Sequence, residues 1–193
     1  MTEKLIPNDY RIVQKVIHWL MALFVILDLL GAQQFGGVME ESERLATRMD
    51  HATLGTSLGI LLLLRLYFRI RSGVPLLPPT TPGWQVRSAR TVHVLLYVAM
   101  VCLISTGALT ATQATDPIFI FNSIEVTIGK LDDESFKFVR QFHEFMTWTM
   151  ISLITLHVLA AMFHQFVRKD RVLVKMLKFW KSEQPEAAQS QGN

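Results

Sequence analysis

The sequence is poor in cysteine, and this scarcity excludes several classes of redox site. Cys102 is its only cysteine. One thiol cannot form an intrachain disulfide, a CxxC redox pair or a cysteine-rich iron–sulfur site, and the CxxCH motif that attaches haem covalently is absent. Any haem bound by this chain would therefore be held by histidine or methionine, without thioether bonds.

Charged residues are also scarce, at 18% of the chain, and they are clustered. Half of the 193 residues are hydrophobic, and long uncharged windows lie between the charged clusters. This composition argues against an ordinary soluble domain. It predicts an all-α membrane protein built as a small bundle of spanning helices.

Four apolar stretches are long enough to cross a bilayer, which takes about 20 helical residues. The predicted spans are residues 14–35, 51–70, 89–112 and 138–167. They predict a four-helix transmembrane bundle in a single domain over residues 1–181. The first stretch follows a basic segment and also resembles a signal peptide, but no small-residue cleavage site follows it.

The segments between and after the spans are polar or rich in proline. The connector PLLPPTTP lies between the second and third spans, and residues 113–135 are predicted to be a mixed loop. After the fourth span, Leu173, Met176, Leu177 and Trp180 share one helical face, which predicts a C-terminal interfacial amphipathic helix. Residues 182–193 are predicted to be a disordered tail.

The distribution of basic residues predicts the orientation in the membrane. Four spans place both termini and the proline-rich connector on one side, which carries most of the lysines and arginines. The other side carries only Arg44, Arg48, Lys130, Lys137 and Arg140. Because Lys and Arg are enriched in cytoplasmic loops, both termini are predicted to be cytoplasmic.

The six histidines fall into two layers of this predicted bundle. The outer layer contains His51 and His143, at the starts of the second and fourth spans. The inner layer contains His18, His93, His157 and His164. His143 and His157 are ~21 Å apart along one helix and within roughly 40° of the same face. Paired imidazoles at two depths predict two b-type haems, one near each side of the bilayer.

The outer layer allows only one axial pair, whereas the inner layer offers four histidines for two axial positions. Depth does not choose between His157 and His164. A ligand separation of ~21 Å rather than ~31 Å along the helix favours His157, because electron tunnelling falls steeply with distance. For His93 and His164, a hydrogen bond between helices explains the residue as well as a functional role does.

The residues that carry this pattern resemble the bacterial cytochrome b561 family, which is grouped with the di-haem cytochrome b subunits of nickel hydrogenase and formate dehydrogenase. The matching pieces are His18-Trp19, His51 before a glycine-containing stretch, Arg65 and Arg69, the proline-rich connector, His93 with Tyr97, His143-Glu144, and LHVLAAMFH over 156–164.

The resemblance implies two non-covalent b haems. It places the outer iron between His51 and His143 and the inner iron between His18 and His157. His93 and His164 match positions that are not axial ligands, and they are predicted to lie near an inner quinone or the haem propionates. Arg65 and Arg69 are candidate propionate partners on the inner side, and Arg140 is one on the outer side. Anchoring of the inner arginines by the positive-inside rule is an equally good explanation.

Bis-histidine ligation leaves no open position on iron, so oxygen activation at the metal is not expected. The chain is therefore predicted to move electrons across the bacterial inner membrane, between a periplasmic one-electron partner and ubiquinone or menaquinone. Nucleic acid is not an expected partner. Asp28, a carboxylate inside the first span, is a candidate for proton traffic or for pairing with a cation.

Two alternative functions remain open at this stage. One is a superoxide:ubiquinone oxidoreductase, against which the net negative charge of the outer loops argues, because superoxide is an anion. The other is a membrane-anchor cytochrome b subunit of a dehydrogenase or hydrogenase.

Overall fold

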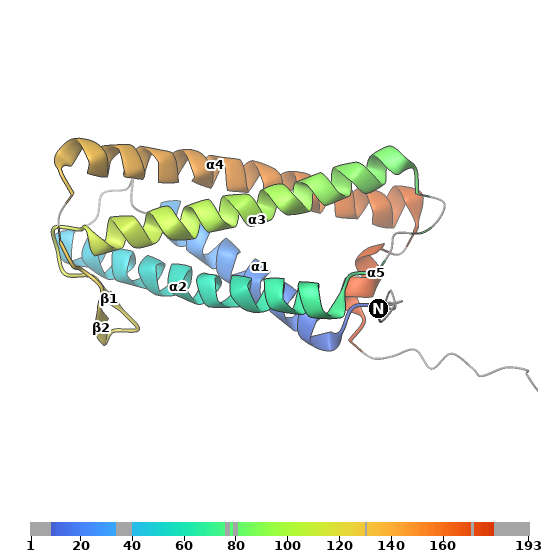
Figure 1. Ribbon diagram of the computed structural model, residues 1–193, viewed down its shortest axis with the longest axis horizontal. Coiled ribbons are helices and arrows are strands. Elements are labelled where there is room, and N and C mark those ends of the chain that lie inside the picture. Colours follow the sequence, from blue (N-terminus) through green and yellow to red (C-terminus); the bar gives the residue numbers. More distant parts are fainter. Residues whose placement is uncertain are drawn as a thin grey trace, which may run out of the picture.

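Four long helices and a small hairpin make up the fold in the computed structural model (Figure 1). The structure describes residues 9–33, 40–75, 78, 81–129, 131–170 and 172–179. The elements are α1 (Ile12–Gln33), α2 (Glu41–Ser72), α3 (Gly83–Thr112), β1 (Phe119–Ile120), β2 (Ile124–Glu125), α4 (Asp133–Phe163), the π-helical turn η2 (His164–Arg168) and α5 (Val172–Leu177).

The predicted class, an all-α protein with four apolar helices of membrane-spanning length, is confirmed. The four long helices are long and apolar enough to cross a bilayer. Most of the proline-rich connector, Trp180 and the tail over 182–193 lie outside the described residues, as do the last two residues of the first predicted span.

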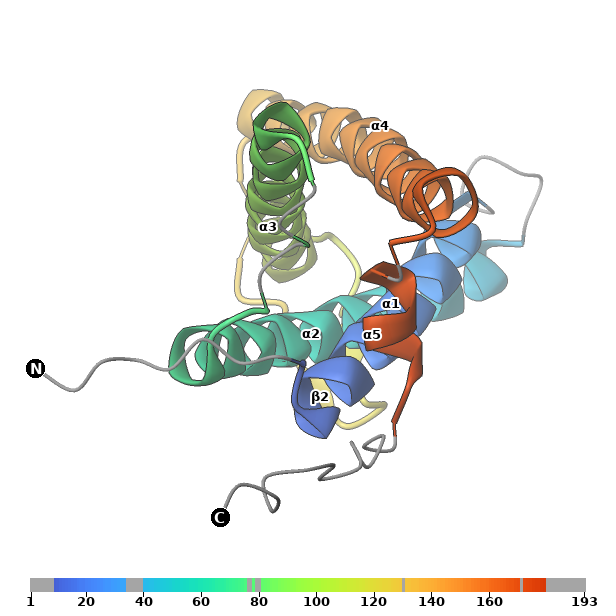
Figure 2. The same ribbon diagram turned by 90° about the vertical axis from the view of Figure 1, so that its right-hand side faces the viewer.

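The helices pack as two pairs. α1 packs on α2 and α3 packs on α4, while α2 also contacts α3. Figure 2 looks along the bundle and shows α3 and α4 above α1 and α2. Ile17, Met21 and Leu62 form a buried cluster in the first pair. The second pair is held by Ala99 with two methionines of α4.

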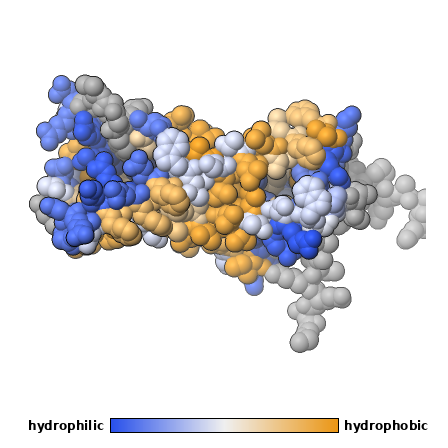
Figure 3. Space-filling view, turned by 90° about the horizontal axis from the view of Figure 1, so that it is seen from above, coloured by the Kyte–Doolittle hydropathy of each residue, from blue (hydrophilic) through white to orange (hydrophobic). Residues whose placement is uncertain are grey.

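The outside of the bundle is apolar along its middle. The face drawn in Figure 3 has a hydrophobic band between two hydrophilic ends. Large side chains such as Leu63 and Ile70 are 69% and 67% exposed. Exposed apolar surface of this extent marks a contact with protein or membrane. Lipid tails covering the band explain why the chain leaves so many apolar residues on its surface.

All four long helices begin before the predicted spans, α1 by only two residues. α2 begins at Glu41 and α4 at Asp133, so His51 and His143 each lie almost three turns inside their helices rather than at the first turn. Hydropathy follows only the apolar part, whereas acidic residues in the first turn extend both helices outwards. At α4 the Asp132 carboxylate accepts a hydrogen bond from the Ser135 backbone N–H, and this bond lowers the pKa of Asp132.

The predicted loop over residues 113–135 contains a short hairpin. β1 and β2 pair antiparallel, with Phe119 opposite Glu125. Phe121 and Asn122 adopt left-handed backbone conformations, with φ of 52° and 53°. The Phe121 N–H donates to Thr53 Oγ1 at 3.0 Å, which ties the hairpin to α2. Strands of two residues are too short to show the alternation of apolar and polar residues that predicts a strand from sequence.

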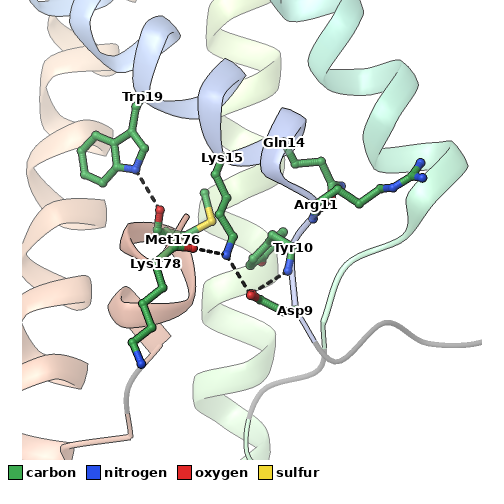
Figure 4. A network of polar contacts seen from close by, with 8 residues as sticks. All are labelled: Asp9, Tyr10, Arg11, Gln14, Lys15, Trp19, Met176 and Lys178. Carbon is green, nitrogen blue, oxygen red and sulfur yellow. Dashed lines mark hydrogen bonds and ion pairs between the residues drawn. The ribbon is translucent and has the colours of Figure 1, made fainter. Parts of the chain in front are cut away.

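At the opposite end of the bundle, α5 docks on the start of α1 (Figure 4). The Lys15 side chain is only 3% exposed and pairs with Asp9 at 2.8 Å. Its ammonium also donates to the Lys178 carbonyl, and Trp19 Nε1 donates to the Met176 carbonyl at 3.0 Å. Over the described residues α5 is shorter than the amphipathic helix that the sequence predicts. We call this end of the molecule the termini end, and the end with β1 and β2 the hairpin end.

Candidate functional site

Two histidines face each other near the hairpin end. His51 comes from α2 and His143 from α4, and their ring centroids are 6.1 Å apart with an angle of 84° between the ring planes. Both residues are partly buried between the two helix pairs. The structure thus brings together the two residues that form the predicted outer pair.

A second pair lies nearer the termini end. His18 of α1 and His157 of α4 have ring centroids 6.3 Å apart and ring planes at 82°. His93 of α3 lies beside them, with its centroid 5.2 Å from that of His157. α4 therefore contributes one histidine to each pair, as the spacing of fourteen residues on one helical face predicts.

The distances can be compared with those that one iron atom requires. A bond from metal to imidazole nitrogen is about 2 Å, and the ring centre lies about 1.1 Å beyond that nitrogen, so two imidazoles on opposite sides of one iron have centroids about 6.2 Å apart. The His51/His143 and His18/His157 pairs fit this distance. The centroids of His93 and His157 are closer together than this distance, at 5.2 Å.

His143 is held by two residues of α3. Thr106 Oγ1 lies 2.8 Å from His143 Nδ1 and also donates to the Cys102 carbonyl at 2.7 Å. Because a hydroxyl has one proton, this arrangement leaves Thr106 to accept from the Nδ1–H of His143, so that Nε2 is the nitrogen without a proton. At Gly107 an added Cβ would lie 3.3 Å from His143 Cε1, so glycine allows the ring to approach α3.

The other two histidines have different surroundings. His93 Nδ1 lies 2.7 Å from the Ala89 carbonyl of its own helix, which leaves its Nε2 available to a ligand. His164 Nδ1 lies 2.5 Å from Asp170 Oδ2, and the His164 and Asp170 side chains are only 13% and 7% exposed. His164, directly after α4, is thus held by Asp170. His93 lies beside the His18/His157 pair.

The two arginines proposed as inner propionate partners, Arg65 and Arg69, lie where α1, α2 and α3 meet at the termini end. Arg65 donates to the Gln14 carbonyl at 3.5 Å, and Gln14 lies one turn before His18 on α1. Arg69 lies over the Tyr97 ring, 5.6 Å from its centroid and one turn after His93. Arg140 is exposed on α4, three residues before His143.

A small cavity lies between α5 and the two arginines Arg65 and Arg69. Its volume is about 20 Å³, and Tyr10, Arg65, Arg69, Tyr97 and Met176 are among the residues that line it. This volume holds roughly one water molecule. Burial raises the pKa of Tyr10, so its phenol stays protonated and can donate a hydrogen bond beside the two guanidinium groups.

Three partners of the histidines were not predicted from the sequence. They are Thr106 and Gly107 beside His143 and Asp170 beside His164. The adjacent small residues of the third span were the only available signal, and small residues in a membrane helix indicate close packing without naming the partner. Asp170 lies beyond the last span, where no pattern connects it to a histidine.

The chain is also similar to known proteins over most of its length. A model of a family described as prokaryotic cytochrome b561 matches residues 9–179. Cytochrome b561 homolog 1 of Escherichia coli K12 is 28% identical over 174 residues, which cover 88% of this chain and 97% of that protein. Cytochrome b561 homolog 2 of the same organism is 26% identical, covering 89% and 92%. Probable superoxide oxidase CybB of Yersinia pestis is 24% identical, covering 88% and 96%.

Proposed function

The chain belongs to the prokaryotic cytochrome b561 family, and from this premise we propose that it is a di-haem b-type cytochrome that moves electrons between a partner at the hairpin end and a quinone at the termini end. It is a multi-pass membrane protein, and the family implies haem b. The number of haems, their ligands and the quinone are the parts that we propose.

The observation that carries the proposal is the geometry of the two histidine pairs. Their centroid distances of 6.1 and 6.3 Å would suit two imidazoles that bind one iron. His51 with His143 would hold the haem at the hairpin end, and His18 with His157 would hold the haem at the termini end. Each bound haem would supply a one-electron couple with no open coordination position.

The surrounding residues have distinct roles in this proposal. Thr106 would fix His143 with Nε2 towards the iron, because a hydrogen bond at one ring nitrogen orients the other. Arg65 and Arg69 would pair with propionates at the termini end. His93, next to His157 and with Nε2 available, is our candidate to bind a quinone oxygen; His164 is the weaker candidate, since Asp170 already occupies its Nδ1.

The proposed orientation places the termini end in the cytoplasm and the hairpin end in the bacterial periplasm. Arg65, Arg69, Arg87 and Arg90 lie at the cytoplasmic end in this arrangement, as the positive-inside rule favours. A ubiquinone or menaquinone would then be reached from the cytoplasmic leaflet, and a redox protein of opposite charge would be steered to the acidic periplasmic end.

Reoxidation of the reduced protein by quinone tests this function. We expect the α-band of purified, chemically reduced protein to disappear when a short-chain ubiquinone analogue is added. His93→Ala should slow this step about tenfold at low quinone concentration, because it removes a polar contact of about 1.4 kcal/mol. His164→Ala tests the weaker candidate in the same assay and should keep the wild-type rate, because Asp170 already holds His164 Nδ1. A protein without haem, or a reduced haem indifferent to quinone, would contradict the proposal.

A second candidate function is the oxidation of superoxide with quinone as acceptor. It is favoured by the similarity to probable superoxide oxidase CybB. Arg140 is exposed near His143 and would provide local positive charge, whereas Arg48 is paired with Asp116 at 3.5 Å. Quinone reduction driven by an enzymatic superoxide source, and abolished by superoxide dismutase, would support this candidate; unchanged quinone reduction with dismutase present would exclude it.

A further inference from the structure

Asp28 is a carboxylate within the membrane helix α1, five residues before its end at Gln33, and it points at a predicted haem ligand. Its Oδ1 lies 2.8 Å from His51 Nδ1, and the side chains of Asp28 and His51 are 14% and 27% exposed. Both of these atoms are shielded from solvent, and the contact between them is a close charge contact whose geometry is not that of a hydrogen bond. An ionisable side chain at this depth is costly, and such residues generally have a functional partner.

The contact fixes which nitrogen of His51 can bind a metal. Two lone pairs held 2.8 Å apart would repel each other, so the ring nitrogen that faces the carboxylate is the one that carries a proton. The proton at Nδ1 leaves Nε2 as the lone-pair nitrogen. A carboxylate in this position also strengthens the imidazole as an electron donor to a bound metal.

The two histidine pairs differ in the charge of their neighbours. At the hairpin end the partner of His51 is the anionic Asp28, and the partner of His143 is the neutral Thr106. At the termini end the nearest charged groups on α2 are cationic: Arg65 is bonded one turn from His18, and Arg69 lies one turn from His93. Negative charge favours the ferric state of a nearby haem, and positive charge favours the ferrous state.

We propose that Asp28 is a positioning residue that holds His51 and keeps the midpoint potential of the haem at the hairpin end below that of the haem at the termini end. This inference rests on the proposed function, because it requires a haem at each pair. It adds a direction to that function: electrons run downhill from the hairpin end to the termini end, towards quinone.

A redox titration of the purified protein tests the proposal without any assay of activity. The wild type should show two one-electron transitions, and the lower one should be missing in His51→Ala. In Asp28→Asn, which keeps the shape but not the charge, the ferrous-to-ferric ratio of this haem should rise roughly tenfold at a fixed potential, or about 59 mV. The upper transition should stay in place and serves as an internal reference.

Asp116→Asn is the matched control. Asp116 is a carboxylate at the same end, but it is 48% exposed and pairs with Arg48 instead of a histidine. Water and salt screen such a charge, so its removal should move neither transition. Equal shifts in Asp116→Asn and Asp28→Asn would overturn the proposal, because a general loss of charge would then explain both.

The outcomes for the two proposals are separable. Suppose that the wild type binds two haems and that the lower-potential haem survives in His51→Ala. This result would overturn the role of Asp28 and leave the proposed function intact. Fewer than two haems in the wild type would overturn the proposed function itself. If Asp28→Asn does not assemble, Asp28→Glu keeps a carboxylate and should retain the wild-type order of potentials; a reversed order would contradict the proposal.

Discussion

Each histidine of the pair at the hairpin end is contacted by a neighbour on a different helix. Asp28 of α1 faces His51 of α2, and Thr106 of α3 faces His143 of α4. In both cases the contact is made at Nδ1, which leaves Nε2 as the nitrogen available to bind a metal. Ring orientation thus depends on packing between helices, and a change on α3 should be felt by a ligand on α4.

Gly107→Ala tests this dependence at a single residue. The new Cβ would lie 3.3 Å from His143 Cε1, closer than ordinary contact, and His143 cannot easily move because Thr106 holds it. Overpacking of this kind typically costs about 1–3 kcal/mol. We expect purified Gly107→Ala to lose at least half of the haem at the hairpin end, measured by pyridine haemochrome, while the haem at the termini end is retained.

Gly59→Ala is the control for this substitution. It also adds one methyl group to a membrane helix, but its Cβ would meet only Ile104 Cγ2, at an ordinary 3.5 Å. The haem content of Gly59→Ala should therefore match the wild type. An equal loss of haem in both variants would show that the methyl group disturbs the bundle in general and not the His143 ring.

The short helix α5 closes the termini end through contacts to backbone carbonyls. Lys15 and Trp19 of α1 donate to the carbonyls of Lys178 and Met176, and Met176 lines the cavity beside Arg65 and Arg69. Because the acceptors are main-chain groups, docking depends on the donors of α1 rather than on the side chains of α5. The amphipathic pattern of the sequence describes the side chains only, and it does not reveal this contact.

Trp19→Phe should loosen α5. The substitution keeps an aromatic ring but removes a hydrogen bond worth about 1 kcal/mol, which raises the undocked population about fivefold. We expect cleavage by trypsin after Lys175 to accelerate by this factor, since proteolysis follows the open population. Trp148→Phe alters an exposed tryptophan on α4 and should leave the rate unchanged. Equal rates in Trp19→Phe and the wild type would contradict the docking role.

At the level of the whole molecule, apolar runs predicted the bundle and the histidine spacing predicted its two layers. Both patterns repeat along a helix and can be read locally. The starts of α2 and α4 were missed because their first turns are polar, and hydropathy does not register acidic residues that favour a helix N-terminus.

Contacts between helices could not be predicted in the same way. Asp28 stands out in the sequence as an intramembrane carboxylate, but only the packing of α1 on α2 reveals His51 as its partner. Likewise, the sequence leaves His93, His157 and His164 in one layer, and the distances of the folded chain separate them. His157 lies opposite His18 at 6.3 Å, and His93 lies closer than a shared iron permits.

The central claim is that two haems lie between the two histidine pairs, and haem content of the purified protein tests it most directly. We predict two b haems per wild-type chain. Alanine at His51 or His143 should lose one or make it high-spin, alanine at His18 or His157 should affect the other, and alanine at His93 or His164 should spare both. One haem or none in the wild type, or two unchanged low-spin haems in His157→Ala, would contradict the account.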